Sequence, residues 1–552
     1  MALENIHLRV ILIAWCFTIA EGTTKRSKHY KSPAITFSYE VAVSSTIIGL
    51  LITLFLVYWF IFRPMFNATE RKKRHNRINM FLLEFWKNDV IMKPSWGSRE
   101  YKDISSSIQS LVEDIIVKVF SCKDSSLVIK RENVSKYVKL IGSCQEESKV
   151  QRPDEFDFSI TFPAFSEDNV FVEHGSSIRP DEFMCIHKYL LYEYDNAFVQ
   201  LRYTGSIDKE SQLFRLLTKV NNHYYISAFK MHSFFKRRIR SVVKLLVRDK
   251  YSKTCSTGKL VVEFPDEDKY NSEENGPAWT LPLLWDRNYG KGYRINVDIA
   301  PVILISDQFP AISMTTFKDT NLSAKRFMPY PAICYMLGND RYDYMSNIEQ
   351  MKGGTYSLTY KDVMARVSDE NKLFVELSFL TSHVHHENTL MKELKNSFNN
   401  LFITYQIFKR LEPLWSRFKV KGQLHGLRFH SYVLKTIILD EIIHGKETIS
   451  RHDDVATCFK VILNRIIDLS ESCLRGNHES VTSLWFDEHI LTCAQLPQVL
   501  MYDEEYLHAF RQQFRVLWDL LNTVSEDDAY EYYNYKHVIL DLISKPANFR
   551  IN

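Results

Sequence analysis

The sequence predicts a mixed α/β fold, in which an α/β core is preceded by a membrane helix and followed by an all-helical C-terminal lobe. Two runs, at residues 155–160 and 293–299, alternate polar and apolar residues with the period of a β-strand. From Asp362 onward, apolar residues recur at the 3.6-residue spacing of α-helices. Near the N-terminus, Val41 to Phe62 contains no charged residue. These observations divide the chain into a core at 98–345 and a helical lobe at 346–552.

The N-terminal region predicts a membrane anchor. Residues 1–20 are typical of a signal segment, because Arg9 precedes an apolar run too short to span a bilayer; an uncleaved membrane hairpin is the alternative. Residues 21–40 would be a short extracytosolic segment and residues 41–62 a transmembrane helix. This helix predicts a single-pass protein of the endoplasmic reticulum or plasma membrane. Of the two basic clusters that flank it, the stronger one follows the helix, and basic residues favour the cytosolic side of a membrane. The body of the protein would therefore be cytosolic, with residues 63–97 as a juxtamembrane linker.

Composition narrows the functional classes. The chain has 552 residues and a formal net charge of +4, so any surface that binds nucleic acid must be local. Its nine cysteines include no C-x-x-C pair, which argues for a reduced body and against a disulfide framework. The sequence around Lys259 lacks the upstream glycine of a P-loop, and no dinucleotide fingerprint or usual serine or cysteine nucleophile motif is present.

The first alternating run carries candidate metal ligands. Glu155 and Asp157 share one face of the predicted strand, where two carboxylates repel each other unless a cation lies between them. Upstream, Gly142 and Ser143 form a turn whose N–H groups and hydroxyl suit triphosphate oxygens. The plainer interpretation is an exposed strand with a solvated acidic face.

A third carboxylate favours the metal site. Asp298 lies in the second alternating run, after a Gly290–Gly292 turn, and Trp279 to Trp285 is a plausible partner strand. Two Mg²⁺ or Mn²⁺ ions held by three carboxylates suit in-line phosphoryl or nucleotidyl transfer, because the ions clamp the attacking and leaving oxygens. We therefore expect Glu155, Asp157 and Asp298 to be both the metal ligands and the catalytic carboxylates.

These motifs resemble the nucleotidyltransferase superfamily. Gly-Ser, then Glu-x-Asp on a strand, then a lone Asp on a later strand is its pattern. The sequence is similar to the male abnormal twenty-one family and, within it, to the animal cyclic GMP–AMP synthase-like enzymes. The resemblance covers roughly residues 98–545 and includes LSF at 377–379 and SYVLKT at 431–436. It implies a nucleotidyltransferase core, followed by a helical lobe.

The resemblance also implies further nucleotide-binding residues. Ser378, Ser431 and Tyr432 would line the nucleotide pocket, and Lys435 is a candidate phosphate partner; core packing is the alternative for Tyr432 and Lys435. The chain departs from the synthase pattern at Glu376, where a basic residue is usual, so the resemblance implies no particular base selectivity. No structural zinc is expected, because the histidines at 383, 385 and 386 have no cysteine partner nearby.

Residues 230–253 predict a basic amphipathic helix. Phe235, Ile239, Val242 and Leu246 would form its apolar face. The candidate ridge for binding double-stranded RNA or DNA consists of Lys236, Arg237, Arg240, Lys244 and Arg248. An ordinary solvated helix face is the alternative.

The resemblance implies synthesis of a nucleotide second messenger, a cyclic dinucleotide, from ATP and GTP, with activation by double-stranded nucleic acid as an open question. A catalytically inactive membrane adaptor, which binds nucleotide or a protein partner without turnover, is the alternative. A plain RNA-tailing transferase is a third hypothesis, and it would yield a 3′-extended oligonucleotide.

Overall fold

The computed structural model divides the chain into two compact units, Met1–Arg77 and Ile78–Asn552. It describes residues 49, 52–121, 127–166, 168–174, 198–262, 274–275, 278–306, 332–337, 376–382, 384–412, 418–420, 423–425, 431–443, 449–474, 504–527, 531–544 and 547–549. The predicted signal segment 1–20 and the segment 21–40 lie outside these residues. So does His383 of the histidine group.

The N-terminal region corrects the prediction of a membrane anchor. Among the described residues, no helix is both long enough and apolar enough to span a bilayer. Of the predicted 41–62 span, the structure describes residues 49 and 52–62, and the latter lead through η2 (Tyr58–Phe62) into α3 (Arg63–Phe85). The expected transmembrane helix, and the single-pass membrane location that rested on it, are therefore not supported.

The second unit begins with the end of α3, which continues into η3 (Trp86–Val90). Ile78, Phe81, Leu82 and Phe85 are buried in one hydrophobic core with the C-terminal helices. The last part of the segment predicted as a juxtamembrane linker is thus packed against the helical lobe. The next helix, α4 (Arg99–Val119), begins at the Ser98 N-cap and buries an apolar face that includes Ile104, Ile108 and Leu111.

Among the described residues, 13 strands form one sheet, which contributes to the other core. Its longest path runs in the order β5-β6-β4-β13-β12-β11-β10-β8-β7, with β1, β2, β3 and β9 paired beside that path. The strands are β1 (Val138–Ile141), β2 (Glu155–Thr161), β3 (Val170–His174), β4 (Phe198–Tyr203), β5 (Leu217–Val220), β6 (His223–Ile226), β7 (Ser252–Thr254), β8 (Gly258–Val262), β9 (Glu274–Asn275), β10 (Ala278–Arg287), β11 (Tyr293–Ser306), β12 (Ala332–Leu337) and β13 (Ser378–Ser382). Both predicted strands and the predicted partner strand are present as β2, β11 and β10.

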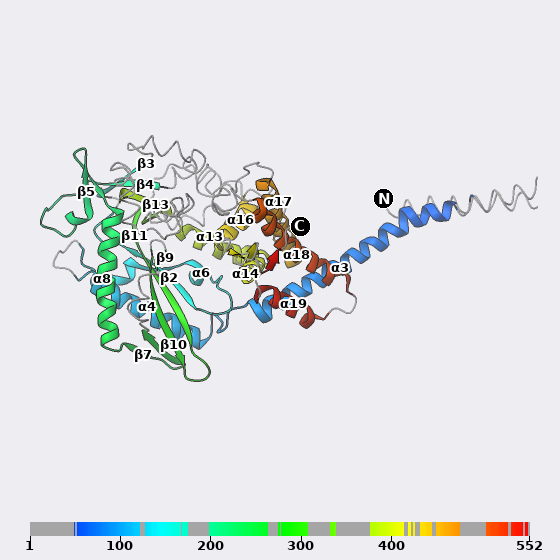
Figure 1. Ribbon diagram of the computed structural model, residues 1–552, viewed down its shortest axis with the longest axis horizontal. Helices are drawn as coiled ribbons and strands as arrows, with labels where there is room; N and C mark the ends of the chain where they lie inside the picture. Colours follow the sequence, from blue (N-terminus) through cyan, green and yellow to red (C-terminus); the bar gives the residue numbers. More distant parts are fainter. Residues whose placement is uncertain are drawn as a thin grey trace, which may run out of the picture. The chain divides into compact units, whose positions relative to one another are not determined.

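Short helices connect these strands, and two long helices cover part of the sheet. The short elements are η5 (Arg131–Asn133), α5 (Val134–Tyr137), α6 (Gly142–Gln145) and η6 (Phe214–Leu216). The basic helix α8 (Ala228–Arg248) lies beside α4, as Figure 1 shows. Phe235, Ile239, Val242 and Leu246 of α8 are buried with the sheet, which confirms the predicted apolar face.

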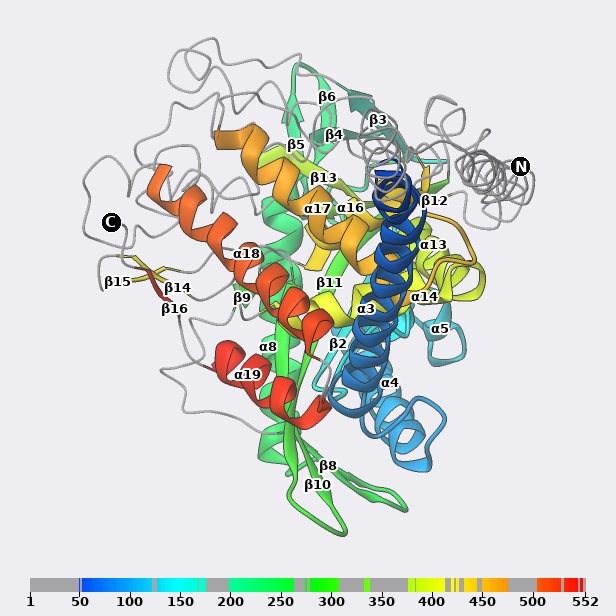
Figure 2. The same ribbon diagram turned by 90° about the vertical axis from the view of Figure 1, so that its right-hand side faces the viewer.

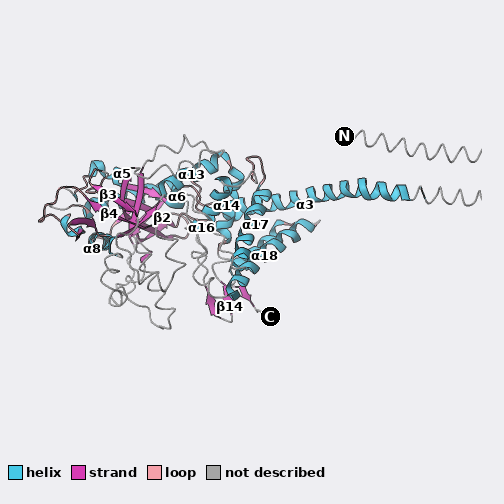
Figure 3. Ribbon diagram, turned by 90° about the horizontal axis from the view of Figure 1, so that it is seen from above, coloured by secondary structure: helices cyan, strands magenta, loops and turns pink. Residues whose placement is uncertain are grey.

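The described part of the C-terminal half is mainly helical but not all-helical. Its helices are α13 (Val384–Ser397), α14 (Asn399–Leu411), α16 (Ser431–Ile443), α17 (Val455–Leu474), α18 (Glu504–Glu526) and α19 (Tyr532–Ser544). In Figure 2, α17 lies beside α16 and α18, with which it packs. The prediction of an all-helical lobe is corrected by β13, which joins the main sheet, and by a small sheet of β14 (Phe418–Val420), β15 (Gln423–His425) and β16 (Ala547–Phe549). In Figure 3, the strands of the large sheet lie to the left of α17 and α18, whereas α13 contacts β1 and β12 of that sheet.

Candidate active site

The three predicted carboxylates meet at the junction of two parallel strands. β2 pairs with β11 in a register that places Asp157 opposite Asp298 and Glu155 opposite Asn296. One ligand oxygen each from Glu155, Asp157 and Asp298 lies within 4.8 Å of the others. Because neighbouring parallel strands present aligned residues to the same face, strand alternation and register together create this carboxylate cluster.

The Gly142 turn closes one side of the cluster. β1 is antiparallel to β2 and places Ile141 opposite Asp157, so the chain turns directly beside that carboxylate. Gly142 has a φ of +68°, and a Cβ at this position would lie 2.3 Å from Asp157 Oδ2. Only glycine avoids both the backbone strain and the clash. The next residue, Ser143, accepts hydrogen bonds at its carbonyl from the N–H groups of Ser148 and Lys149, at 2.9 and 3.1 Å.

The three carboxylates of the cluster repel one another, and a bound cation would offset this repulsion. Burial, together with the charges of Glu155 and Asp298, raises the pKa of Asp157 to about 7. On β10, the Thr280 hydroxyl donates a 2.5 Å hydrogen bond to Asp298 Oδ1. Carboxylate oxygens are the ligands that Mg²⁺ and Mn²⁺ prefer, so these three side chains fit the expected divalent ions.

Lys149 approaches the same cluster from the loop that follows Ser143. Its Nζ lies 2.6 Å from Glu155 Oε2 and 3.1 Å from Asp154 Oδ1. Burial alone would raise the pKa of Glu155, but the neighbouring ammonium groups of Lys149 and Lys409 lower it below its usual value. Two carboxylates on one strand face therefore have opposite pKa shifts.

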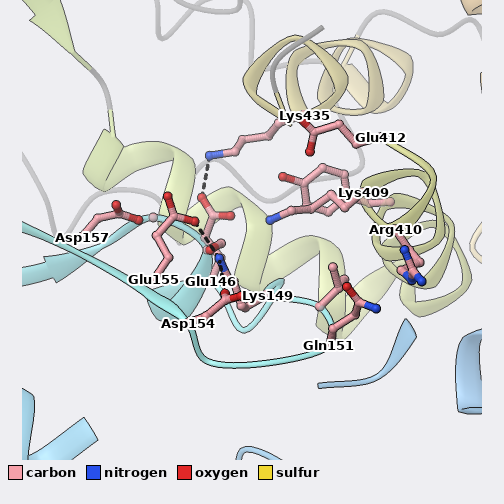
Figure 4. A pocket seen from close by; sticks show the side chains of 14 residues that line it. Glu146, Lys149, Gln151, Asp154, Glu155, Asp157, Lys409, Arg410, Glu412 and Lys435 are labelled. Carbon is pink, nitrogen blue, oxygen red and sulfur yellow. Dashed lines mark hydrogen bonds and ion pairs between the residues drawn. The ribbon is translucent and has the colours of Figure 1, made fainter. Parts of the chain in front are cut away.

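A cavity of about 380 Å³ extends from these residues to the helical lobe. Its walls come from the 142–157 segment, α14 and α16: Gly142, Ser143, Glu146, Lys149, Val150, Gln151, Asp154, Glu155, Asp157, Tyr405, Lys409, Arg410, Glu412 and Lys435. In Figure 4, Lys409 extends from α14 toward Glu146 and Lys149. The cavity thus has carboxylates on the strand side and cationic side chains on α14.

The sequence reasoning missed Lys409 and Arg410. They end the apolar pattern of α14, where a Lys-Arg pair usually indicates only a favourable helix C-terminus. Burial and the nearby ammonium groups of Lys149 and Lys435 lower the pKa of Lys409 to about 8, although Glu146 and Glu155 oppose this effect. The Lys409 ammonium also lies 5.5 Å from the centre of the Tyr405 ring.

Lys435 lies at the cavity, but its ammonium is held by carboxylates. Its Nζ is 2.6 Å from Glu146 Oε1 and 3.3 Å from Glu387 Oε2, and all three side chains are buried. Burial alone would lower the pKa of Lys435, but the charges of Glu146 and Glu387 raise it well above its usual value. Lys435 therefore connects α16 to the Gly142–Ser143 segment and to α13, instead of presenting a free charge for phosphate.

The other predicted nucleotide-binding residues are placed only by their backbone. Ser378 begins β13, and Ser431 and Tyr432 begin α16, while their side chains lie outside the described part of the structure. Glu376, where the resemblance expects a basic residue, accepts hydrogen bonds from Thr218 and Ser227 at 2.6 and 3.0 Å. Glu376 thus ties β5 to the N-cap of α8 and is not among the residues that line the cavity.

The ranges that the structure describes contain one cluster with the composition of a metal site. Within those ranges, the carboxylate cluster is the sole group of three or more His, Cys, Asp or Glu side chains close enough to hold a metal ion. His385 and His386 lie in α13, and their side chains are not described.

The predicted basic ridge lies on α8, away from the cavity walls. Arg237, Lys244 and Arg248 are exposed, and Lys236 and Arg240 are partly buried. Arg238 donates to the carbonyls of Val119 and Ser121, at 3.2 and 3.5 Å, and so links α8 to the end of α4. The ridge exists as a surface feature, and its binding to nucleic acid stays a prediction.

No protein-family model matches this chain, and a search of curated proteins finds no match to it. The resemblance to the male abnormal twenty-one family therefore stays a prediction from the sequence motifs.

Proposed function

We propose that this chain is a metal-dependent nucleotidyltransferase that makes a nucleotide second messenger, a cyclic dinucleotide, from ATP and GTP. One observation carries the proposal: Glu155, Asp157 and Asp298 converge within 4.8 Å on adjacent strands, and the first two of them line a cavity that also contains cationic side chains. A triphosphate needs both features, because its oxygens bind divalent ions and its remaining charge is stabilised by Lys and Arg.

Each residue of the cavity has a role in this proposal. Glu155, Asp157 and Asp298 would hold two Mg²⁺ or Mn²⁺ ions, which stabilise charge on the attacking and leaving oxygens when bound. Asp298, oriented by Thr280, accepts the proton of the attacking ribose hydroxyl as it forms a bond to the α-phosphorus and pyrophosphate leaves. The Gly142–Ser143 turn holds donor phosphate oxygens, and Lys409 and Arg410 neutralise phosphate charge from α14.

Product analysis tests this proposal directly. Bound metal would first be removed from the full chain with a chelator. The protein would then be incubated with ATP, GTP and Mn²⁺ or Mg²⁺, with and without duplex RNA or DNA. Mass spectrometry would identify the products. We expect formation of a cyclic dinucleotide and release of pyrophosphate, both only when the divalent ion is present. A 3′-extended oligonucleotide would indicate the RNA-tailing alternative, and it would contradict second-messenger synthesis.

Activation by double-stranded nucleic acid is a separate part of the proposal. Arg237, Lys244 and Arg248 are exposed on α8 and suit contacts with a phosphate backbone. The logarithm of the duplex-binding constant falls linearly with the logarithm of the salt concentration, and each phosphate contact contributes about one to that slope. Replacing Arg237 and Lys244 by Glu should therefore reduce the slope by about two. Equal slopes for the wild-type and variant proteins in a filter-binding salt titration would contradict a role for α8.

Nucleotide binding without turnover is the second candidate function. The observation that favours it is the 2.6 Å contact between Lys149 and Glu155, because an internal cation already neutralises one of the expected metal ligands. A non-catalytic binder would retain ATP or GTP in equilibrium dialysis and yet release no pyrophosphate with any divalent ion.

A further inference from the structure

Lys149 lies where the loop, the carboxylates and the cavity meet. Its backbone N–H donates to the carbonyl of Ser143 at 3.1 Å, so the turn expected to hold phosphate also positions Lys149. Its side chain is 13% exposed and its Nζ contacts both Asp154 and Glu155. Figure 4 shows this ammonium between the carboxylates of β2 and the cationic side chains of α14.

We propose that Lys149 is an exchangeable counter-ion, which holds Glu155 in the metal-free protein and transfers to triphosphate oxygens when a divalent ion and nucleotide bind. This inference rests on the proposed function, since it concerns the metal ligands and the nucleotide cavity of the same site. It makes Lys149 a nucleotide-binding residue, and it makes metal and nucleotide binding depend on each other.

The first reason is electrostatic competition. A lysine ammonium 2.6 Å from Glu155 Oε2 and a divalent ion on the same carboxylate would repel each other strongly in a partly buried site. A metal ion that binds alone must therefore move the ammonium away from Glu155 or accept a weaker set of ligands. Metal affinity in the absence of nucleotide should be low as a result.

The second reason is that Lys149 has an alternative anion within reach once nucleotide is bound. Its side chain already lines the cavity together with Lys409 and Arg410. Lysine carries its charge on a flexible four-carbon stem, so the ammonium can turn from Glu155 toward the cavity while the backbone stays bonded to Ser143. A triphosphate in the cavity would accept this ammonium, as phosphate oxygens are strong acceptors for lysine.

The two steps together produce thermodynamic coupling. Nucleotide removes the competitor of the metal, and metal releases a ligand for the nucleotide, so each should raise the affinity for the other by the same factor. Removing the Lys149 ammonium should have two opposite effects: tighter binding of metal alone and weaker binding of nucleotide. A merely structural lysine would give no such pair of effects.

The experiment measures binding of Mn²⁺ to the full chain by calorimetry, alone and with a non-hydrolysable ATP analogue. The variants are Lys149→Met and Lys149→Gln; the Gln side chain keeps a hydrogen-bond donor beside Glu155 without the charge. Lys139→Met is the matched control, because Lys139 is exposed on β1 and its loss changes the net charge equally. Thermal melting checks that each protein is folded.

We expect both Lys149 variants to bind Mn²⁺ alone about tenfold more tightly than the wild-type protein, and the ATP analogue more weakly, with reduced coupling between the two. Lys139→Met should match the wild type. If the wild type binds Mn²⁺ and both Lys149 variants bind it equally or more weakly, the counter-ion proposal is overturned while the metal site stands. If the wild type binds no Mn²⁺ with or without the analogue, the proposed function fails too.

Discussion

The two sides of the cavity are built by different means. The strand side takes its carboxylates from β2 and β11, whose register alone places Asp157 beside Asp298. The helical side takes Lys409 and Lys435 from α14 and α16, and these side chains reach the cavity only because the helical lobe packs against the 142–151 segment. On the strand side, local alternation places Glu155 and Asp157 on one face, and backbone pairing with β11 adds Asp298. On the helical side, the arrangement depends on side-chain contacts such as that between Lys435 and Glu146.

The largest expected effect concerns the contact between the two sides. Lys435→Met would leave Glu146 and Glu387 buried without their cation, and we expect a loss of about 3–5 kcal/mol in the free energy of unfolding. Chemical denaturation of the full chain measures it. Lys392→Met, an exposed position on α13, is the control and should change stability by less than about 0.5 kcal/mol. Equal stabilities of the two variants would mean that the buried ion pairs do not join the two sides.

The next effect tests the local construction of the strand side. Gly142→Ala should cost about 1–3 kcal/mol, because alanine strains the backbone at a φ of +68° and its Cβ approaches Asp157 Oδ2. Gly97→Ala is the matched control, since a Cβ there meets no atom within 4 Å. Melting temperatures of both variants provide the comparison. A Gly142→Ala protein as stable as Gly97→Ala would show that the turn tolerates a side chain.

These two predictions also mark what the sequence could reveal. Strand alternation predicted Glu155 and Asp157 on one face, and the Gly-Ser pair predicted a turn beside them, because both features depend on residues close in the chain. Lys435 was expected to contact phosphate, but Glu146, 289 positions away in the sequence, binds its ammonium instead. No local pattern reports such a partner.

In the N-terminal region, too, the local sequence pattern did not reveal what the apolar residues contact. The uncharged stretch at 41–62 predicted a membrane span, yet the described residues contain no helix of sufficient length and apolarity. The apolar residues that follow, at 78–85, were expected in a linker, and they are instead buried with the C-terminal helices. Apolar periodicity predicts a helix well, but it does not identify the surface that the helix buries.

The smallest effect concerns repulsion within the carboxylate cluster. Asp157→Asn should raise the stability of the metal-free protein by about 1 kcal/mol, a usual size for a single site, because it removes one of three close charges. It should also abolish the stabilisation that Mn²⁺ gives to the wild type. Thermal melting with chelator and then with excess Mn²⁺ measures both effects. A destabilised variant that still responds to Mn²⁺ would place the metal elsewhere.

The central claim is that the carboxylate cluster carries out metal-dependent nucleotidyl transfer. The most direct measurement is pyrophosphate release from ATP and GTP by the full chain with Mn²⁺, compared between the wild type and the Glu155→Gln/Asp157→Asn double variant. Asp286→Asn, an exposed carboxylate on β10, is the control for loss of an acidic side chain. The account predicts that the double variant loses about a thousandfold or more in rate, the equivalent of several kcal/mol, while the control keeps the wild-type rate. Equal rates in all three proteins would contradict it.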